Sequence, residues 1–434
     1  MDQLDTVVAL SSGAGRAGVA VIRISGHRVR FILETICGEI PPPRLAALRR
    51  IRDALGEPID TGLVLFFPAP QSFTGEDVAE LQLHGSRAIL AATLARLTSL
   101  PGVRLAEPGE FTRRAFEAGK LDLAAVEGLA DLIDSETEWQ RKQALRQMEG
   151  ALGEMATGWR DALIQAMALV EADLDFSDEG DVSGPLLEQV LGLVRGVRDE
   201  LGRALGSFAV GERVRDGFVV VLAGPPNAGK SSLLNALARR DVAIVSPVAG
   251  TTRDSLEVRL DLGGIPVVLI DTAGLRETTD EVEAEGVRRA RRHIARSDLT
   301  LLLRPVDSEP FQNESMPELI RLATKADLAG QVLPGELAVS ATTGAGIDAL
   351  LSEIQTRLLA SGTVEPALLT RERHRVAVTD AKAALDRALV AGSEQAELVA
   401  EDIRTGVRSL ERLIGRIGVE DVLDQLFSGF CIGK

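Results

Sequence analysis

Residues Gly224 to Ser231 have the spacing G-x-x-x-x-G-K-S, which is typical of a loop that binds the phosphates of a nucleotide. The apolar run FVVVLA precedes the loop and the stretch SLLNAL follows it, so we expect a strand before it and a helix after it. Glycines allow the backbone N–H groups to turn toward phosphate, and the helix start adds positive charge. We expect Lys230 to reach the outer phosphates and to be catalytic, and Ser231 to offer its hydroxyl to Mg²⁺.

Further motifs follow in the order that a GTPase requires. The apolar strand IPVVLI leads into DTAG, where Asp271 can hold magnesium through water and Gly274 can offer its N–H to the γ-phosphate. AGTTRD, residues 250–254 and the alanine before them, lies where a switch loop supplies a threonine to Mg²⁺. TKAD and SAT complete the series at Thr324–Asp327 and Ser340–Thr342. The ordered motifs predict a GTPase domain.

Asp327 is expected to select the base. A carboxylate can accept both the N1–H and the exocyclic N–H₂ of guanine, and adenine would lose both charge-assisted bonds, each worth about 1.5–3 kcal/mol. Thr324 stands where the usual N-K-x-D motif has asparagine, and a lost contact to the base edge should cost about 1 kcal/mol. We therefore expect guanine affinity to fall several-fold while specificity survives.

Leu275 follows DTAG, where many small GTPases have a glutamine that orients water. Leucine cannot polarise water, so another group must do so. The acid-rich stretch RETTDEVEAEG supplies candidates, although its residues alone are more typical of a solvated helix face.

The sequence pattern that predicts the surrounding helices and strands changes along the chain. Residues 1 to about 119 alternate short β-rich runs with helical stretches, which predicts a compact α/β unit. From about Leu121 the apolar residues recur every three and four positions, and a second helical block runs from about Arg371 to Leu426. Between the blocks, about Gly217 to Leu359, strands and helices alternate as in a parallel βαβ sheet. We expect a helical domain interrupted by an inserted α/β domain.

Composition agrees with a multidomain globular protein. At 434 residues the chain is too long for one ordinary core, and its hydrophobic content is 45% with 26% charged residues. The net charge of −16 argues against broad nonspecific binding to nucleic acid, so an RNA partner needs a local basic patch or a second, basic protein. No apolar run approaches the roughly 18 residues of a membrane span, and the acidic start MDQLDTVVALSSG does not resemble a secretory signal.

Two cysteines, Cys37 and Cys431, are too few for a disulfide framework, which favours a reduced, cytoplasmic setting. Cys37 is expected to be a small buried hydrophobic residue. His84 has no second ligand at a suitable spacing, so we interpret it as structural. The tail LFSGFCIGK poses a question, because an exposed thiol four residues from the end is a liability unless it is used.

The whole chain resembles the tRNA modification GTPase MnmE (TrmE) family. The resemblance rests on long ordered motifs: DTVVA, GRAGVAVIRISG, SFTGEDVAELQLHG, EPGEFTRRAFEAGKLDLAAVEGLADLIDS, GPPNAGKSSLLN, AGTTRD, DTAGLRETTDEVE and FCIGK. It implies an N-terminal folate-binding and dimerisation domain (1–119), a helical domain in two segments (120–211 and 370–434, ending in the CIGK tail), and an inserted P-loop GTPase domain (212–369).

The resemblance also implies an activity. Such proteins form homodimers and act with the flavoprotein MnmG (GidA), in a heterotetramer or larger assembly, on the wobble uridine (U34) of certain tRNAs. Together they install an aminomethyl or carboxymethylaminomethyl group at C5, with the carbon from 5-formyl- or 5,10-methylene-tetrahydrofolate and the nitrogen from ammonium or glycine. GTP hydrolysis in the family uses K⁺ in place of an arginine finger.

Site residues follow from the motifs and the resemblance together. Glu283 is implied to orient the attacking water, Cys431 to lie at the transferred carbon, and Ser231 and Thr252 to bind Mg²⁺. The implied K⁺ ligands are Asn227, Ser246, Val248 and Thr251. The implied folate contacts are Arg23, Glu80, Lys120 and Lys434. The GTP site comprises Asn227, Ala228, Gly229, Lys230, Ser231, Ser232, Ser246, Pro247, Val248, Ala249, Gly250, Thr251, Thr252, Asp271, Thr272, Ala273, Gly274, Lys325, Asp327, Ser340 and Ala341.

Two other functions remain open from the sequence. A ribosome-assembly GTPase would share the inserted domain without needing folate, although no basic or KH-like appendage is visible. A folate-dependent aminomethyl- or formyltransferase with a decayed nucleotide domain is disfavoured, because Lys230, Ser231, Asp271, Glu283 and Asp327 are all retained.

Overall fold

A computed structural model describes residues 5–13, 15–175, 183–244, 257–271, 297–310, 318–360, 367–392, 395–417, 420–430 and 432–433. The chain forms two compact units, each considered separately below. The first comprises residues 1–130, 153–160 and 408–434, and the second comprises residues 131–152 and 161–407.

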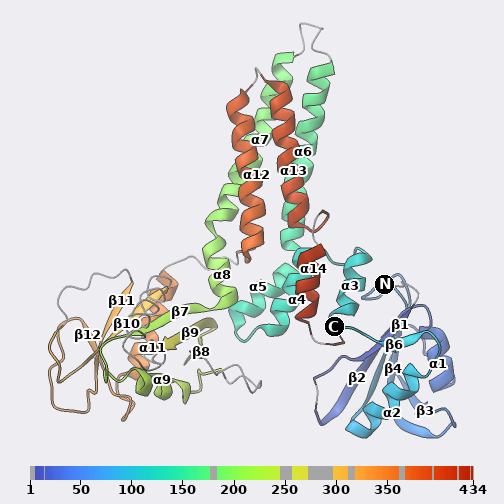
Figure 1. Ribbon diagram of the computed structural model, residues 1–434, viewed down its shortest axis with the longest axis horizontal. Coiled ribbons are helices and arrows are strands. Elements are labelled where there is room, and N and C mark those ends of the chain that lie inside the picture. Colours follow the sequence, from blue (N-terminus) through green and yellow to red (C-terminus); the bar gives the residue numbers. More distant parts are fainter. Residues whose placement is uncertain are drawn as a thin grey trace, which may run out of the picture. The chain divides into compact units, whose positions relative to one another are not determined.

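A six-stranded sheet forms the centre of the first unit, with strand order β3-β4-β5-β2-β1-β6 (Figure 1). All neighbours are antiparallel except β1 and β6. Helices α1 and α2 contribute Ile32, Leu33 and Leu97 to the core on one face. On the other face Phe111 of α3 packs with Val7 of β1. The elements are β1 (Thr6–Leu10), β2 (Ala17–Ser25), α1 (Val29–Cys37), β3 (Ala47–Arg52), β4 (Pro58–Phe67), β5 (Val78–Gly85), α2 (Arg87–Thr98), β6 (Val103–Leu105) and α3 (Glu110–Glu117).

The C-terminal end of the chain returns to this first unit. Phe427 of α14 (Glu420–Ser428) packs with Val126 of α4 (Leu123–Asp134). Gly109 must be glycine, because its φ is +68° and a Cβ would lie 2.9 Å from the Phe427 carbonyl oxygen. Beyond α14, Ile432 forms an antiparallel bridge with Pro108, and the Ser11 hydroxyl donates to the Gly433 carbonyl at 2.7 Å. The described part of the tail is therefore tied to the N-terminal sheet.

A second six-stranded sheet lies in the second unit, with order β12-β11-β10-β7-β9-β8. All neighbours are parallel except β8 and β9, which form a hairpin. Parallel strands bring their carboxyl ends to one edge of a sheet, where ligands of open α/β folds bind. The predicted parallel βαβ sheet is confirmed. Its elements are β7 (Phe218–Ala223), α9 (Lys230–Ala238), β8 (Glu257–Leu262), β9 (Ile265–Asp271), β10 (Leu299–Pro305), β11 (Leu319–Thr324), β12 (Glu336–Val339) and α11 (Ile347–Ala360).

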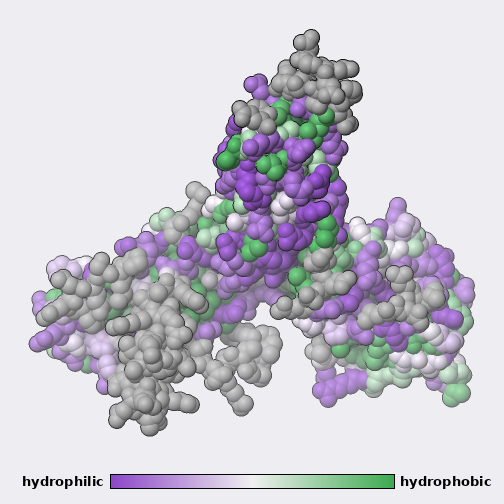
Figure 2. Space-filling model, turned by 45° about the horizontal axis from the view of Figure 1, so that its top comes forward, coloured by the Kyte–Doolittle hydropathy of each residue, from purple (hydrophilic) through white to green (hydrophobic). Residues whose placement is uncertain are grey.

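Long helices occupy the predicted helical blocks, together with shorter helices before and after them. Figure 1 shows α6, α7, α12 and α13 running side by side. In the second unit a Cβ at Gly406 would lie 3.2 Å from Leu385 and 3.6 Å from Leu163, so glycine permits close packing. On the face shown in Figure 2 these helices are mainly hydrophilic, with isolated hydrophobic residues. None of the helices in the described ranges is long and apolar enough to cross a bilayer. The remaining helices are α5 (Glu138–Met148), α6 (Ala151–Asp175), α7 (Ser183–Gly206), α8 (Phe208–Asp216), α12 (Glu372–Ala391) and α13 (Ala396–Leu413).

Helix α5 connects the helical residues of the second unit to the parallel sheet. Thr137 and Gln140 form a capping box at its start. The Gln140 side chain then donates to the Arg215 carbonyl at 2.9 Å, and Gln143 donates to the Ala367 carbonyl at 3.2 Å. Arg215 lies at the end of α8, three positions before β7 begins, and Ala367 follows α11, so α5 bonds the chain near where it enters and where it leaves the sheet domain.

The hairpin of β8 and β9 provides a third connection to α5. Gly263 and Gly264 form its turn with φ values of +66° and +94°, a conformation that favours glycine. The Trp139 backbone N–H donates to the Gly264 carbonyl at 3.1 Å, and Arg259 pairs with Glu136 at 3.2 Å. The hairpin tip is thus fixed to the first turn of α5.

Candidate functional site

The phosphate-binding loop lies between β7 and α9, as predicted. Gly224 has a φ of +146° and a Cβ there would lie 2.5 Å from the Leu303 carbonyl oxygen, so only glycine fits. Asn227 and Gly229 are left-handed, with φ values of +62° and +87°. Lys230 is 6% exposed, and its Nζ donates to the carbonyls of Gly224 and Pro225 at 2.7 and 2.9 Å. The lysine is therefore folded back over the loop that it is expected to serve.

Oxygen ligands suited to Mg²⁺ meet beside this loop. The Ser231 hydroxyl donates to the Asp271 carboxylate at 2.6 Å, and Asp271 is fully buried at the end of β9. Mg²⁺ prefers oxygen ligands and commonly keeps several waters. Ser231 can hold the ion directly and Asp271 through water, so the residues fit the predicted magnesium site.

The base-selecting residues follow two adjacent strands, with Asp327 after β11 and Ser340 directly after β12. The Ser340 hydroxyl donates to Asp327 Oδ1 at 2.5 Å, which orients the carboxylate and leaves its other oxygen to accept from a base. Lys325 has a φ of +56°, so the chain turns sharply between Thr324 and Asp327. A hydrogen bond between side chains thus joins the TKAD motif directly to the SAT motif.

Thr324 makes a contact that the TKAD motif did not predict. It is 4% exposed, and its hydroxyl donates to the Ala228 carbonyl in the phosphate-binding loop at 2.7 Å. The threonine therefore contacts the loop, where the sequence had suggested only a lost contact to the base.

Several predicted residues of the GTP and folate sites lie outside the described residues, so the structure does not test their placement. The catalytic residues in this group are Glu283 and Cys431, and the implied folate contact is Lys434. The others are Ser246, Pro247, Val248, Ala249, Gly250, Thr251, Thr252, Thr272, Ala273 and Gly274.

The first unit brings Arg23 and Glu80 together. They are register partners on β2 and β5, and the Arg23 guanidinium donates to Glu80 Oε1 at 2.9 and 3.1 Å. Both side chains are partly exposed, at 24% and 20%. The guanidinium also lies 5.7 Å from the ring centroids of Phe73 and Phe111. This arrangement offers a carboxylate, a cation and aromatic surface in one place.

Lys120 lies beside the loop that carries Phe73. A Cβ at Gly75 would lie 3.7 Å from Lys120 Cε, and the Lys120 N–H donates to the Ala115 carbonyl at 2.8 Å. The loop between β4 and β5 therefore contacts both Arg23, through Phe73, and Lys120, through Gly75. Two of the four implied folate contacts therefore touch one loop, and a third, Glu80, pairs with Arg23.

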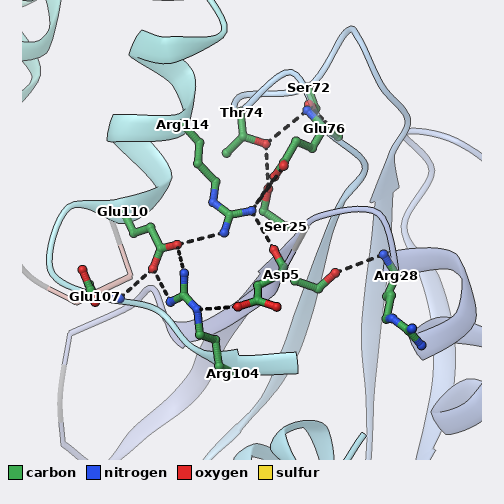
Figure 3. A network of polar contacts seen from close by, with 11 residues as sticks. Asp5, Ser25, Arg28, Ser72, Thr74, Glu76, Arg104, Glu107, Glu110 and Arg114 are labelled. Carbon is green, nitrogen blue, oxygen red and sulfur yellow. Dashed lines mark hydrogen bonds and ion pairs between the residues drawn. The ribbon is translucent and has the colours of Figure 1, made fainter. Parts of the chain in front are cut away.

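A partly buried polar network, centred on the buried Glu110, supports this loop (Figure 3). Glu110 is 4% exposed and accepts from Arg104 at 2.6 and 2.8 Å and from Arg114 at 2.8 Å. Arg114 also donates to Glu76 at 2.9 Å, and Glu76 accepts from Ser25 at 2.8 Å. The network thus ties α3 to the loop between β4 and β5.

The network also sets the charge of Glu110. Burial alone raises the pKa of this carboxyl, but hydrogen bonds from Arg104, from the Glu107 backbone and from Arg114 outweigh that effect and lower the pKa below its usual value. Glu110 is therefore a firmly ionised group between two guanidinium groups. Sequence reasoning missed it, and the signal was the high charge density of EPGEFTRRAFE around the apolar residues Phe111, Ala115 and Phe116.

His84 and Cys37 have structural surroundings. His84 lies on the surface with Nδ1 2.9 Å from Asp60, and hydrogen bonds from His84 help to lower the pKa of Asp60 against the effect of burial. Cys37 packs against the sheet core, and burial raises the pKa of its thiol to about 12. The Cys37 thiol is therefore protonated and a poor nucleophile near neutral pH.

Comparison with known proteins covers the whole chain. A model of the MnmE helical domain matches residues 123–431, and a model of the GTP-binding protein TrmE N-terminus matches residues 6–120. The tRNA modification GTPase MnmE of Azorhizobium caulinodans is 53% identical over 432 residues, which is 99% of each chain. The chain belongs to the MnmE family. The family predicted from the motifs is confirmed, and with it the enzyme class, a GTP hydrolase.

Other MnmE proteins are equally similar. Those of Rhodopseudomonas palustris and a Methylobacterium species are 51% and 54% identical over 437 and 440 residues, each covering 99% of this chain. The MnmE match therefore includes the N-terminal sheet and the helical residues as well as the GTPase motifs. The predicted fold class, an N-terminal α/β domain with a helical domain and a P-loop GTPase domain, is confirmed.

Proposed function

We propose that this protein is a K⁺-dependent GTP hydrolase that acts with a flavoprotein of the MnmG type on the wobble uridine of certain tRNAs. The product is a uridine that carries an aminomethyl or carboxymethylaminomethyl group at C5, with its one-carbon unit from a tetrahydrofolate derivative. The main support is the full-length similarity to tRNA modification GTPases, combined with a phosphate loop, a magnesium pair and a base-selecting carboxylate at one sheet edge. Residues 1–119, 120–211 with 370–434, and 212–369 would be its folate-binding, helical and GTPase domains, in a homodimer.

The GTPase site supplies positioning and electrostatics. Lys230 would leave the carbonyls of Gly224 and Pro225 for the phosphates, and Ser231 and Asp271 would hold Mg²⁺. A K⁺ ion beside the phosphates would stabilise transition-state charge, which is the task of an arginine finger elsewhere. Asn227 is exposed at the tip of the loop, so its side chain is accessible as the proposed K⁺ ligand.

Folate binding is supported by the chemistry around Arg23. Glu80 can accept from the donor edge of a pterin, and Phe73 offers a ring beside the Arg23 guanidinium that pairs with Glu80. Lys120, and Lys434 by the family resemblance, would suit the glutamate tail or formyl oxygen. The tail residues Ile432 and Gly433 lie against the N-terminal sheet, which is compatible with a Cys431 thiol near the transferred carbon.

Nucleoside analysis of tRNA tests the proposed function. Cells that lack this protein should accumulate wobble uridine without its C5 group, and the gene should restore the modification. Normal wobble modification in the deleted strain would contradict the proposal, and a defect in ribosome assembly alone would favour the rival function.

We predict that K⁺ accelerates GTP hydrolysis at least about tenfold over Na⁺, because a fixed cation supplies part of the roughly 10³- to 10⁵-fold effect of an arginine finger. Asn227→Ala should remove most of this stimulation while GDP binding changes little. The measurement is phosphate release at constant ionic strength.

Asn235→Ala is a matched control, because Asn235 is exposed on α9 and lies outside the phosphate loop. It should retain the response to K⁺. Equal hydrolysis rates of the unaltered protein in K⁺ and Na⁺ would exclude the proposed role of potassium.

A further inference from the structure

Thr324 is the last residue of β11 and is held rigidly there. It pairs with Pro305 on β10 and with Val339 on β12, so a strand lies on each side of it. Its side chain is 4% exposed and β-branched, which restricts its rotamer. From this fixed position its hydroxyl donates to the Ala228 carbonyl at 2.7 Å.

The peptide group that accepts this bond lies in a sharply turned part of the phosphate loop. Asn227 and Gly229 flank Ala228, and both have left-handed φ values, +62° and +87°. In a trans peptide the carbonyl of one residue and the N–H of the next point in opposite directions. The Gly229 N–H therefore points away from Thr324, and backbone N–H groups of such loops bind phosphate.

We infer that Thr324 is a positioning residue for the phosphate-binding loop and makes no hydrogen bond to the guanine. A hydroxyl has one proton to donate, and that of Thr324 is given to Ala228. The guanine N7 is an acceptor, so it can receive nothing from Thr324 while this bond exists. An asparagine amide has two protons and can serve both acceptors.

Guanine recognition through this motif accordingly depends on Asp327, which Ser340 orients. The unusual threonine retains the mechanical contact to the loop and gives up only the contact to N7. Loss of the Thr324 hydroxyl should therefore weaken the binding of every nucleotide whose phosphates the loop holds, whichever base the nucleotide carries.

The test compares GDP with 7-deaza-GDP, which lacks the N7 acceptor, in calorimetric titrations of the full-length protein with Mg²⁺. Thr324→Val removes the hydroxyl at nearly constant volume and leaves the Ala228 carbonyl without this donor. We expect both dissociation constants to rise by about tenfold, with their ratio unchanged, since an unsatisfied buried group typically has an effect of that size. Thr324→Ser should restore both to within about threefold.

Thr324→Asn provides an independent readout. It should tighten the binding of GDP several-fold and leave the binding of 7-deaza-GDP unchanged. The dissociation constant of 7-deaza-GDP divided by that of GDP should therefore rise. This variant keeps a donor for Ala228, and its result decides the inference even if Thr324→Val fails to fold.

Thr300→Val is a matched control. Thr300 is 2% exposed on the neighbouring strand β10, near its amino end, and its hydroxyl lies 3.2 Å from that of Ser297. The control should bind both nucleotides like the unaltered protein. Unchanged binding by Thr324→Val, weakening of GDP alone, or an unchanged ratio in Thr324→Asn would each overturn the inference.

Discussion

Replacement of Asp327 by asparagine is expected to transfer the nucleotide preference from guanine to xanthine. The carboxylate accepts from two N–H groups of guanine, and Ser340 holds it in place at 2.5 Å. An amide presents one donor and one acceptor, which opposes the guanine amino group but complements the C2 carbonyl of xanthine. Loss of two charge-assisted hydrogen bonds should lower the affinity for GDP by about 10²- to 10³-fold. Calorimetric titrations with GDP and XDP measure both changes.

Asp348→Asn is the control for this exchange. Asp348 is an exposed carboxylate at the start of α11 that pairs with Arg240 at 2.9 Å, so its neutralisation should not change base preference. A variant at Asp327 that still prefers GDP to XDP would show that other groups select the base.

Replacement of Glu110 by glutamine is expected to loosen the first unit. The neutral amide removes the buried counter-charge of the Arg104 and Arg114 guanidinium groups and leaves them only the more exposed carboxylates of Asp5 and Glu76, and breaking such a buried pair typically costs about 3 kcal/mol. The folded pKa of Glu110 lies below its unfolded value, so its stabilisation is present above an unfolded pKa of about 4.3 and is lost as the pH falls through the folded pKa. The variant should therefore also lose part of the acid dependence of stability.

Hydrogen exchange of the full-length protein measures this effect locally. Amides of α3 and β1 should exchange about 10²-fold faster in the variant at pH 7. Glu138→Gln is the control: Glu138 also pairs with an arginine at a helix start, and hydrogen bonds from Arg141 and then Lys142 lower its pKa to about 2, but it lies on the surface. Exposed ion pairs contribute little to stability, so in Glu138→Gln the hydrogen exchange of the α5 amides should hardly change. Unaltered exchange at α3 in Glu110→Gln would show that the network does not stabilise it.

The sequence predicted the parts of the GTP site that depend on order and spacing. A strand followed by G-x-x-x-x-G-K-S fixes the loop, and parallel strands bring Asp271 and Thr324 to the same edge without further information. Pairings between distant residues were not predictable, because periodicity reports only local structure. The Thr324 bond to Ala228 spans 96 positions, and the buried Arg304–Glu336 pair spans 32.

The N-terminal site shows the same division. Alternation placed Arg23 and Glu80 on strands, but only the register of β2 and β5 makes them partners. The charged run around Glu110 gave no sign that this carboxylate is buried, because charged residues on a short helix usually face solvent. Its burial depends on how α3 packs on the sheet and on the two arginine side chains that bond Glu110.

The attachment of the β8–β9 hairpin to α5 has a consequence for the GTP cycle. Strand β9 begins beside Gly264, which the Trp139 N–H holds, and ends seven residues later at Asp271, which bonds Ser231. A strand of this length spans about 20 Å and resists stretching. A displacement of the Asp271 carboxylate along the strand axis should therefore move the first turn of α5. Release of phosphate, which frees the magnesium site, would then be accompanied by motion of this helix.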